Sequence, residues 1–389
     1  EGGRKLSSNT EASGRFHTDW LNMMYPRLKL ARNLLREDGV VFISIDDHEV
    51  QNLRVMMNEI FGEENFVASV VWQKVFAPKN SAKHFSEDHD YVIVYAREAS
   101  LWRPQMLPRT EEMEARYTNP DNDYRGPWAS DNLTARNYYG AGTYPVECPA
   151  GRVIEGPPSG RYWAVSKEKF DALNADNRIW WGAERNNMPR LKRFQSEVQT
   201  GKVPQTIWPH EEVGNTQEAK KELISCVTFP DSDAVFETPK PVRLIRRMLH
   251  LSTKSHDSDI VMDFFGGSGS TMHAVFAQNA EDNGNRRCVL VQLPEIIPSN
   301  DREKLTIVQF TKERLRRAGK KIREENPLFA GDLGFRVFKL SSSNIRAWEP
   351  DREKLAETLE ASVDHLKTDR TEQDILFELL LKLGLDLTV

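Results

Sequence analysis

Residues 259–272 read DIVMDFFGGSGSTM and constrain the fold of this 389-residue chain more than any other stretch. An apolar strand over 260–262 runs into Asp263, two phenylalanines and a glycine-rich loop, and a helix is predicted to open at Ser270 or Thr271. A strand, a tight glycine loop and a helix N-terminus form a cradle of the nucleotide-binding type. The reason is that free backbone N–H groups and the positive end of the helix face the ligand.

The spacing of the glycines excludes the commonest loops of this kind. The dinucleotide fingerprint G-x-G-x-x-G would need glycine at Met272, and no lysine follows the loop as a P-loop requires. The nucleophile elbow G-x-S-x-G fails because its last position, counted from Gly266, is Ser270. The remaining pattern, D-x-F-x-G-S-G-[ST], resembles the S-adenosylmethionine-binding motif of amino-directed DNA methyltransferases. The alternative is a generic glycine-rich turn between a strand and a helix.

Alternating strands and helices surround this motif, and this alternation predicts an α/β fold with a parallel sheet. Apolar periodicity predicts helices over 20–35, 50–61, 271–280, 301–318 and 351–383, and strands over 39–46, 66–73, 90–96, 288–293 and 334–340. A further helix carries Leu244 and Ile245, with Thr238 as its predicted cap and Pro239 in its first turn.

The amino-acid composition and the apolar periodicity of the sequence change between residues 97 and 236. Pro, Gly, Asn, Trp and Tyr dominate there and regular periodicity disappears, which predicts a loop-rich inserted domain. Residues 1–15 are predicted to be extended or disordered, or to form a solvated loop within a longer natural protein.

Composition sets few limits on function. The net charge of −5 does not indicate a nucleic-acid-binding protein, although local basic stretches are more informative than the total charge. Cys148, Cys226 and Cys288 lie too far apart for a disulfide framework or a zinc site, so no metal is expected, and this spacing suits a reducing cytoplasm. No long apolar run or signal peptide is visible, so no membrane contact is predicted.

Several long phrases, in order, resemble the modification (Mod) subunit of type III restriction–modification systems. The resemblance runs from HTDWLNMMYPRLKLARNLL at 17–35 to ILFELLLKLGLDLTV at 375–389 and includes TPKPVRLI, DFFGGSGST, VLVQLPE and ERLRRAGKKI. It implies a Rossmann-like S-adenosylmethionine-dependent methyltransferase sheet with an inserted target-recognition domain. The implied segments are 1–96 (first part of the methyltransferase domain), 97–236 (recognition insert), 237–330 (cofactor-binding part) and 331–389 (an incomplete C-terminal strand and helix region).

The resemblance assigns roles around the glycine loop. The position of Asp263 helps to hold the charged amino-acid end of the cofactor in the family, although a helix-capping role is the alternative. One of Phe264 and Phe265 packs on the cofactor while the other fills the core, and the family alignment favours Phe265. Gly267 and Gly269 allow close approach of the backbone. Thr271 is expected to cap the helix and to reach the ligand.

Two further regions are assigned to the cofactor by resemblance. Lys240, Pro241, Leu244 and Ile245 belong to the motif that the family uses near the methionine part of the cofactor. For Leu244 and Ile245 an ordinary capped amphipathic helix is the alternative. Gln292, in VLVQLPE, stands where nucleotide-binding folds commonly carry an acidic residue for the ribose hydroxyls. A glutamine can still hydrogen-bond a hydroxyl, but the role assigned to this position is open.

The insert occupies the target-recognition position of the family. Its stretch 185–202 carries five basic residues, offset only by Glu197, namely Arg185, Arg190, Lys192, Arg193 and Lys202. Basic side chains contact phosphates, and arginine reads guanine edges, so these five are predicted to bind DNA. The alternative is a solvated charged loop around an aromatic core. A second basic run, 312–323, is predicted to be a solvated helix face or a subunit surface.

One family motif is absent from the sequence. Amino-directed enzymes carry Asp/Asn/Ser-Pro-Pro-Tyr/Phe, whereas the only Pro-Pro here, at 157–158, lies in the insert and lacks the aromatic residue. No catalytic residue is therefore assigned in this chain, and an Asp-Pro-Pro-Tyr is expected upstream of Glu1. The 389-residue chain alone is expected to be inactive in methyl transfer.

The resemblance implies that the intact protein is a site-specific, adenine-specific DNA methyltransferase that uses S-adenosyl-L-methionine. The implied partners are double-stranded DNA, a second copy of the subunit and an ATP-dependent restriction (Res) subunit, in a prokaryotic cytoplasm. The first alternative is a non-catalytic DNA-recognition subunit or a remnant without the motif. The second is a methyltransferase that acts on RNA or a small molecule.

Overall fold

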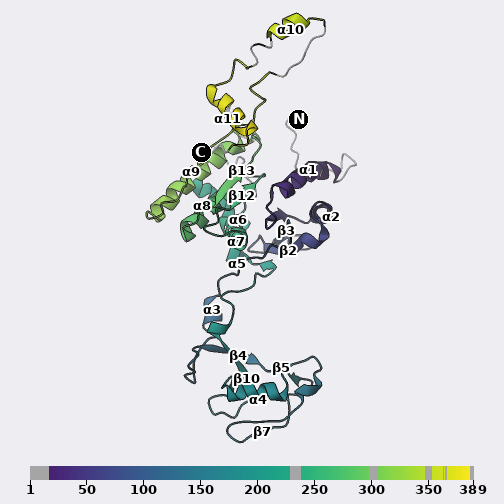
Figure 1. The fold of residues 1–389 in the computed structure, drawn as a ribbon, viewed down its shortest axis with the longest axis vertical. Helices are drawn as coiled ribbons and strands as arrows, with labels where there is room; N and C mark the ends of the chain where they lie inside the picture. The colour runs from purple at the N-terminus through teal and green to yellow at the C-terminus, as the bar shows by residue number, and fades with distance from the viewer. Residues whose placement is uncertain are drawn as a thin grey trace. The chain divides into compact units, whose positions relative to one another are not determined.

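The structure, a computed structural model, describes residues 17–227, 238–297, 305–346, 353–361, 363 and 366–385. The chain forms two compact units, Glu1–Leu333 and Gly334–Val389, and Figure 1 gives the order of their elements. The segment predicted to be extended, 1–15, and the end of the predicted insert, 228–236, lie outside the described residues. No helix in the described part of the chain is long and apolar enough to cross a membrane.

A mixed sheet, here called the first sheet, organises the N-terminal part of the first unit. Its strands are ordered β1 (Val40–Ile45), β3 (His89–Ala96), β2 (Phe66–Gln73) and β11 (Ile207–Trp208). β3 pairs antiparallel with β1 and β2, and β11 pairs parallel with β2. The prediction of a parallel sheet is therefore wrong here, because β2 and β3 follow one another with no crossover helix between them.

Helices cover both faces of the first sheet, which confirms the α/β class. Successive residues of β3 point to opposite faces: Ile93 and Tyr95 pack with α1 (Thr18–Leu34) and α2 (Val50–Phe61). Val92 and Val94 pack on the other side with α7 (Val242–Ser252). Burial on both faces explains why β1 and β3 are apolar almost throughout.

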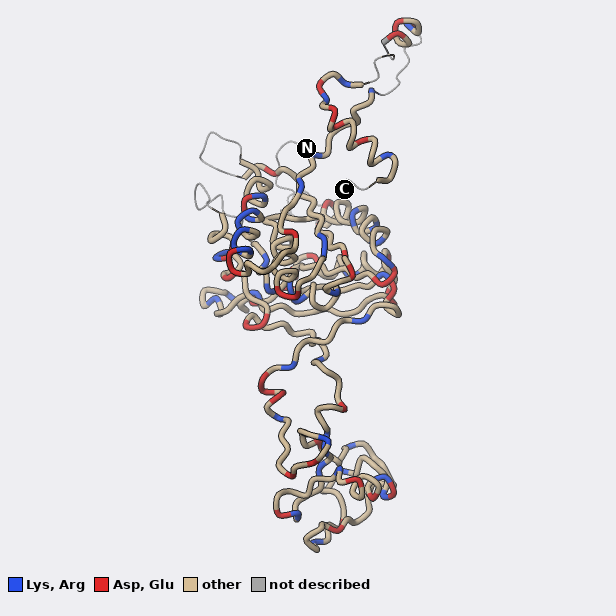
Figure 2. The backbone as a smooth tube through the Cα atoms, turned by 60° about the vertical axis from the view of Figure 1, so that its left-hand side comes forward, with Lys and Arg blue, Asp and Glu red and all other residues tan. Residues whose placement is uncertain are grey.

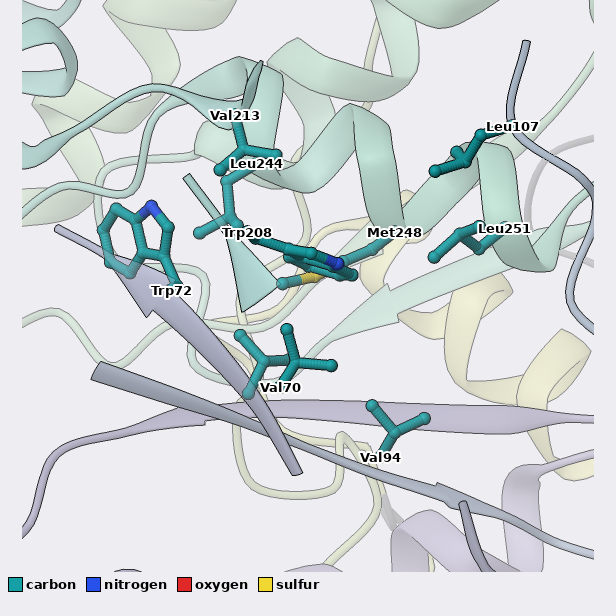
Figure 3. Packing of buried hydrophobic residues seen from close by; sticks show 10 residues of the cluster. Val70, Trp72, Val94, Leu107, Trp208, Val213, Leu244, Met248 and Leu251 are labelled. Carbon is teal, nitrogen blue, oxygen red and sulfur yellow. The ribbon is translucent and has the colours of Figure 1, made fainter. Parts of the chain in front are cut away.

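The core between the first sheet and α7 joins segments far apart in the sequence. Figure 3 shows Val70, Trp72 and Val94 facing Leu244 and Met248, with Trp208 between them. The indole nitrogen of Trp72 donates to the carbonyl oxygen of Gly214 at 2.9 Å, so this buried polar atom is satisfied. Leu107 and Trp208, from the two ends of the predicted insert, also belong to this core.

The glycine loop lies in a second, two-stranded sheet. β12 (Ile260–Asp263) and β13 (Arg287–Leu290) pair in parallel, as predicted, and α8 (Ser270–Asp282) connects them. Val261 and Cys288 pack against α7 and α8 through a cluster that includes Leu249 and Val275. β12, α8 and β13 form the strand–helix–strand crossover of Rossmann-like folds, and α9 (Ile307–Glu325) packs against α8.

The insert has its own aromatic core. Trp163, Trp181 and Phe170 are buried there together with Leu133 and Ile179. Its elements are α3 (Glu111–Glu114), β4 (Trp128–Asn132), β5 (Thr134–Ala135), β6 (Val146–Glu147), β7 (Val153–Ile154), β8 (Tyr162–Trp163), α4 (Lys167–Ala175), β9 (Ile179–Trp180) and β10 (Arg190–Phe194). β10 lies between β4 and β9. The next helices, α5 (His210–Val213) and α6 (Thr216–Cys226), contact α7 and α9 respectively.

Several boundaries differ from the predicted ones: α9 begins at Ile307 and not at 301, and β13 ends at Leu290 and not at 293. α7 begins at Val242 with Pro241 as its N-cap, so the predicted cap at Thr238 is wrong. Residues 334–340 form no assigned strand, and the predicted helix over 351–383 is two helices, α10 (Leu355–Ala361) and α11 (Glu372–Lys382). In this second unit the backbone N–H of Asn344 donates to Glu378 on α11 at 2.6 Å.

Candidate functional site

The glycine loop turns sharply between β12 and α8. Gly267 and Gly269 have φ of +48° and +78°, the left-handed region that glycine adopts without steric cost. A Cβ at residue 269 would lie 2.8 Å from Cγ2 of Thr311 on α9, so the loop has no room for a side chain there. Gly269 is the N-cap of α8. The first backbone N–H groups of α8 therefore have no hydrogen-bond partner within the helix, as is usual at an anion-binding helix N-terminus.

Asp263 fastens both ends of this loop. One carboxylate oxygen accepts from the backbone N–H of Phe265 at 3.0 Å, and the other accepts from the hydroxyl of Thr271 at 2.6 Å. Thr271 was predicted to cap α8, and this prediction is wrong, because Gly269 is the N-cap and Thr271 lies inside the first turn. The helix-capping alternative for Asp263 does not hold for α8, whose N-cap is Gly269.

Gln292 holds the loop from the side of β13. Its side-chain oxygen accepts from the backbone N–H of Gly267 at 2.7 Å, and its side-chain nitrogen donates to the carbonyl oxygen of Leu293 at 3.1 Å. The carboxamide thereby fixes the position of Gly267.

The two phenylalanines of the loop lie in different environments. Phe264 packs against the cluster that α1, α2 and β1 build. Phe265 is 49% exposed, with its ring centroid 5.2 Å from that of Phe264. Phe264 is therefore the one of the two that packs against the core, and Phe265 is the more exposed.

Lys240 and Pro241 lie at the start of α7. The ammonium of Lys240 pairs with the carboxylate of buried Asp90 at 3.1 Å and lies 4.9 Å from the ring centroid of Trp72. Asp90 also binds Lys74 at 2.7 Å. Lys240 is thus tied to the first sheet, and Leu244 is fully buried in the core, which matches the amphipathic-helix alternative for that residue.

A small cavity that the sequence did not indicate opens at the carboxyl end of β1. Its volume is about 200 Å³, and it is lined by Asp46, Asp47, His48, Lys74, Glu87 and His89. The carboxylates outnumber the lysine, which favours ligands with positive charge or hydrogen-bond donors. The available signal was the pair Asp46-Asp47 directly after an apolar strand. Among the described residues no cluster of His, Cys, Asp and Glu could hold a metal ion.

Lys192 is not a DNA contact. Its side chain is fully buried, and its ammonium pairs with Asp121 and, at 3.0 Å, with Asp123. Hydrogen bonds, first from Arg125 and then from Lys192, hold the pKa of Asp123 far below its ordinary value. The ammonium and the guanidinium of Arg125 together balance the charges of Asp121 and Asp123 inside the insert, so Lys192 is not available to a phosphate.

The other predicted DNA contacts lie at or near the surface of the insert. Arg185 and Arg190 are exposed, and Arg193 is 57% exposed and pairs with Asp131 at 3.0 Å. Lys202 exchanges two backbone hydrogen bonds with Leu107 and keeps its side chain half-buried. Figure 2 shows acidic and basic residues interspersed along the insert, and within 185–202 both Lys192 and Arg193 pair with carboxylates from elsewhere in the insert.

The second basic run contains a buried charge that the sequence analysis missed. Arg314 on α9 is 0% exposed, whereas Arg316 and Arg317 on the same helix are 62% and 47% exposed in their side chains. The signal was the spacing of Ile307, Thr311, Arg314 and Ala318, which marks the inner face of the helix.

Comparisons with known proteins agree with this arrangement. The family model described as DNA methylase matches residues 4–282. The type III restriction–modification enzyme StyLTI Mod subunit of Salmonella typhimurium is 35% identical over 335 residues, 84% of this chain and 49% of the relative. The EcoP15I Mod subunit of Escherichia coli is 28% identical over 386 residues, 87% of this chain and 55% of the relative.

The chain spans about half the length of these curated relatives. Among solved structures, TTHA0409 of Thermus thermophilus, complexed with S-adenosyl-L-methionine, shares 12% identity, with 81% of each chain covered and a TM-score of 0.34. A TM-score this low carries no argument about the fold. The match of the family model over residues 4–282, most of the first unit, does: the chain belongs to the DNA methylase family.

Proposed function

We propose that the intact protein transfers a methyl group from S-adenosylmethionine to the exocyclic amine of adenine in duplex DNA, as the modification subunit of a type III restriction system. The observation that carries the proposal is the loop from Asp263 to Ser270, held open at a helix N-terminus in a chain of the DNA methylase family. The similarity to two Mod subunits of type III restriction–modification enzymes supports the choice of a restriction system, and the choice of adenine rests on the family resemblance.

The residues of the loop fit this cofactor. The free N–H groups at the start of α8 suit its carboxylate, and the half-exposed ring of Phe265 offers an apolar surface to its adenine ring. Asp263, Gly267, Gly269, Thr271 and Gln292 give the loop its shape, and Lys240 and Pro241 fix the start of α7. The bound cofactor would supply the methyl group, and the chain's own contribution is to bind and orient it.

The target base must leave the DNA stack to reach a methyl donor held in such a loop. The insert is proposed as the domain that selects the DNA site, with Arg185, Arg190, Arg193 and Lys202 as its candidate contacts. The sequence contains no Asp-Pro-Pro-Tyr, so no residue of this chain is assigned to the adenine amine. The further proposed partners are a second copy of the subunit and an ATP-dependent Res subunit, in the cytoplasm.

The first experiment concerns Asp263. Asp263→Ala should weaken S-adenosylmethionine binding by roughly 1–3 kcal/mol, the usual effect of removing a charged hydrogen-bond partner. Calorimetric titration of the intact protein measures this directly. Unchanged affinity in a folded variant would remove the cofactor role from Asp263.

Thr271→Val is the matched control, because it keeps the side-chain volume and removes only the hydroxyl from which Asp263 accepts a hydrogen bond. If Asp263 touches the cofactor, this variant should keep most of the affinity that Asp263→Ala loses. Equal losses in the two variants would mean that Asp263 acts only by anchoring the loop.

The second experiment concerns the surface arginines of the insert. If Arg193 contacts a phosphate, Arg193→Ala should weaken binding to all DNA sequences about equally. The dependence of the binding constant on salt concentration should fall by roughly one charge. If it reads a base edge, its loss should cost roughly 1–3 kcal/mol at one position of the site. Arg316→Ala, an exposed arginine on α9, is the control. Titrations against site and non-site duplexes at several salt concentrations separate these cases, and no change in either would remove Arg193 from the DNA interface.

A further inference from the structure

Helix α9 contacts the glycine loop through side chains that the proposed function leaves unused. The hydroxyl of Thr311 donates to the carbonyl oxygen of Gly267 at 2.6 Å. The guanidinium of Arg314 donates through Nη1 to the hydroxyls of Ser268 and Ser270, at 2.9 Å each. Both helical side chains therefore hold the loop on its side toward α9.

Arg314 is an unusual group for such a place. It is 0% exposed, the two serines are buried as well, and its Nη2 has no hydrogen-bond partner in the described part of the chain. Burying a guanidinium that is not fully hydrogen-bonded costs free energy, so packing alone does not explain its presence. An apolar side chain of similar length would fill the same space at lower cost.

The groups around Arg314 offer little compensation. Nε of Arg314 donates to Nδ1 of His273 on α8 at 3.4 Å. Burial, and then the charge of Arg314, lowers the pKa of His273 to about 3, so the imidazole stays neutral. The acidic groups that interact electrostatically with Arg314 are Cys226 and Glu222 of α6. Burial raises the pKa of Glu222, which disfavours its charged form.

We propose that α9 is a positioning element for the glycine loop, with Arg314 and Thr311 as its positioning residues. The loop contains two left-handed glycines, and glycine loses more conformational freedom on ordering than other residues. Contacts from α9 hold the hydroxyls of Ser268 and Ser270 and the carbonyl of Gly267. The N–H groups of Phe265, Gly266, Gly267 and Gly269 are bonded within the protein, so a ligand is left to those at the start of α8. In this proposal the loop is ordered before any ligand arrives. The inference rests on the proposed cofactor role of the loop.

The test measures the order of the loop without any cofactor. Hydrogen exchange of the full 389-residue chain is followed by mass spectrometry in peptides that cover residues 264–272. The variants are Arg314→Met and Thr311→Val, which keep the side-chain volume and remove the donors. Arg316→Met, the same substitution at an exposed position of α9, is the matched control.

We expect exchange in residues 264–272 to become about tenfold faster in each variant, the effect of losing roughly one net hydrogen bond. Exchange in β1 and β3 should not change, and the control should behave like the parent. Arg314→Lys, which keeps a donor to the serines, should restore part of the protection. Loop exchange as slow as in the parent in Thr311→Val and in folded Arg314→Met would overturn the proposal.

Titration with S-adenosylmethionine keeps the two proposals apart. If the loop loosens in the variants and the parent binds the cofactor, affinity should fall about tenfold in step with the loss of loop order. If the loop loosens but the parent does not bind S-adenosylmethionine, the positioning role stands and the proposed cofactor is wrong. Reduced affinity with unchanged loop exchange would contradict positioning by α9.

Discussion

Replacing Lys192 with methionine is expected to destabilise the insert by about 1–3 kcal/mol, because it removes the buried cation that Asp121 and Asp123 share and leaves Asp123 with Arg125 alone, at 2.9 Å. Asp123 is fully buried, and Lys192 lies between it and Asp121. A lysine that served only to contact DNA would lie on the surface, where substitutions usually change stability by roughly 0.5 kcal/mol or less. Urea unfolding followed by tryptophan fluorescence measures the effect, since Trp128, Trp163 and Trp181 are buried in the insert.

Arg193→Met is the control for this experiment. Arg193 is the next residue of β10, it points to the opposite face of the strand, and its partner Asp131 is 49% exposed in its side chain. The control should unfold like the parent. If Lys192→Met unfolds like the parent as well, and instead weakens DNA binding with a lower salt slope, the structural role assigned to Lys192 is wrong.

Gly269→Ala is expected to reduce cofactor affinity more than any other single methyl group added to the loop. A left-handed conformation costs a non-glycine residue about 1–3 kcal/mol. The added Cβ would also lie 2.8 Å from Thr311, closer than real contacts allow. The loop must therefore shift, and we expect affinity for S-adenosylmethionine to fall about tenfold to a hundredfold.

Gly266→Ala is the matched control in the same loop. A Cβ at residue 266 would meet Leu290 and Val291 at 3.4 Å, an ordinary contact distance, and residue 266 does not have positive φ. Calorimetry on the two folded variants compares them directly. Equal affinities for S-adenosylmethionine would show that the shape of the loop at Gly269 does not matter for binding.

The glycine motif was predicted almost residue by residue because its information is local. The change from an apolar strand to glycines to a helix is visible within residues 259–272, and α8 begins at Ser270 as predicted. The same holds for β2 and α2, whose predicted bounds are the observed ones. Apolar runs and turn residues fix such elements without reference to the rest of the chain.

Contacts between distant segments were not predictable in this way. The partners of Lys192 lie 71 and 69 residues earlier in the chain, so the run 185–202 looks basic although Lys192 is neutralised. Arg314 was assigned to a solvated face because its neighbours are charged, whereas its helical spacing places it on the buried side. In both cases tertiary contacts, and not the local charge pattern, decide whether a basic side chain meets solvent.

The pairing of strands shows the same limit. Parallel pairing of β12 and β13 follows from the helix between them, because a crossover returns the chain in the same direction. β11 joins the first sheet from beyond the insert, and its two residues, Ile207 and Trp208, are too short a signal to predict. The sequence therefore indicates the glycine loop better than it indicates where the insert returns to the core.

The most direct test of the account is to identify the methylated base. The intact protein is incubated with unmethylated duplex DNA and S-adenosylmethionine labelled in its methyl group, and the DNA is digested to nucleosides for mass spectrometry. We predict labelled N6-methyladenine, and a strong reduction of it in Gly269→Ala at limiting cofactor concentration. Label on cytosine, or no label on DNA under conditions where an intact Mod subunit is active, would contradict the proposal that this protein is an adenine methyltransferase.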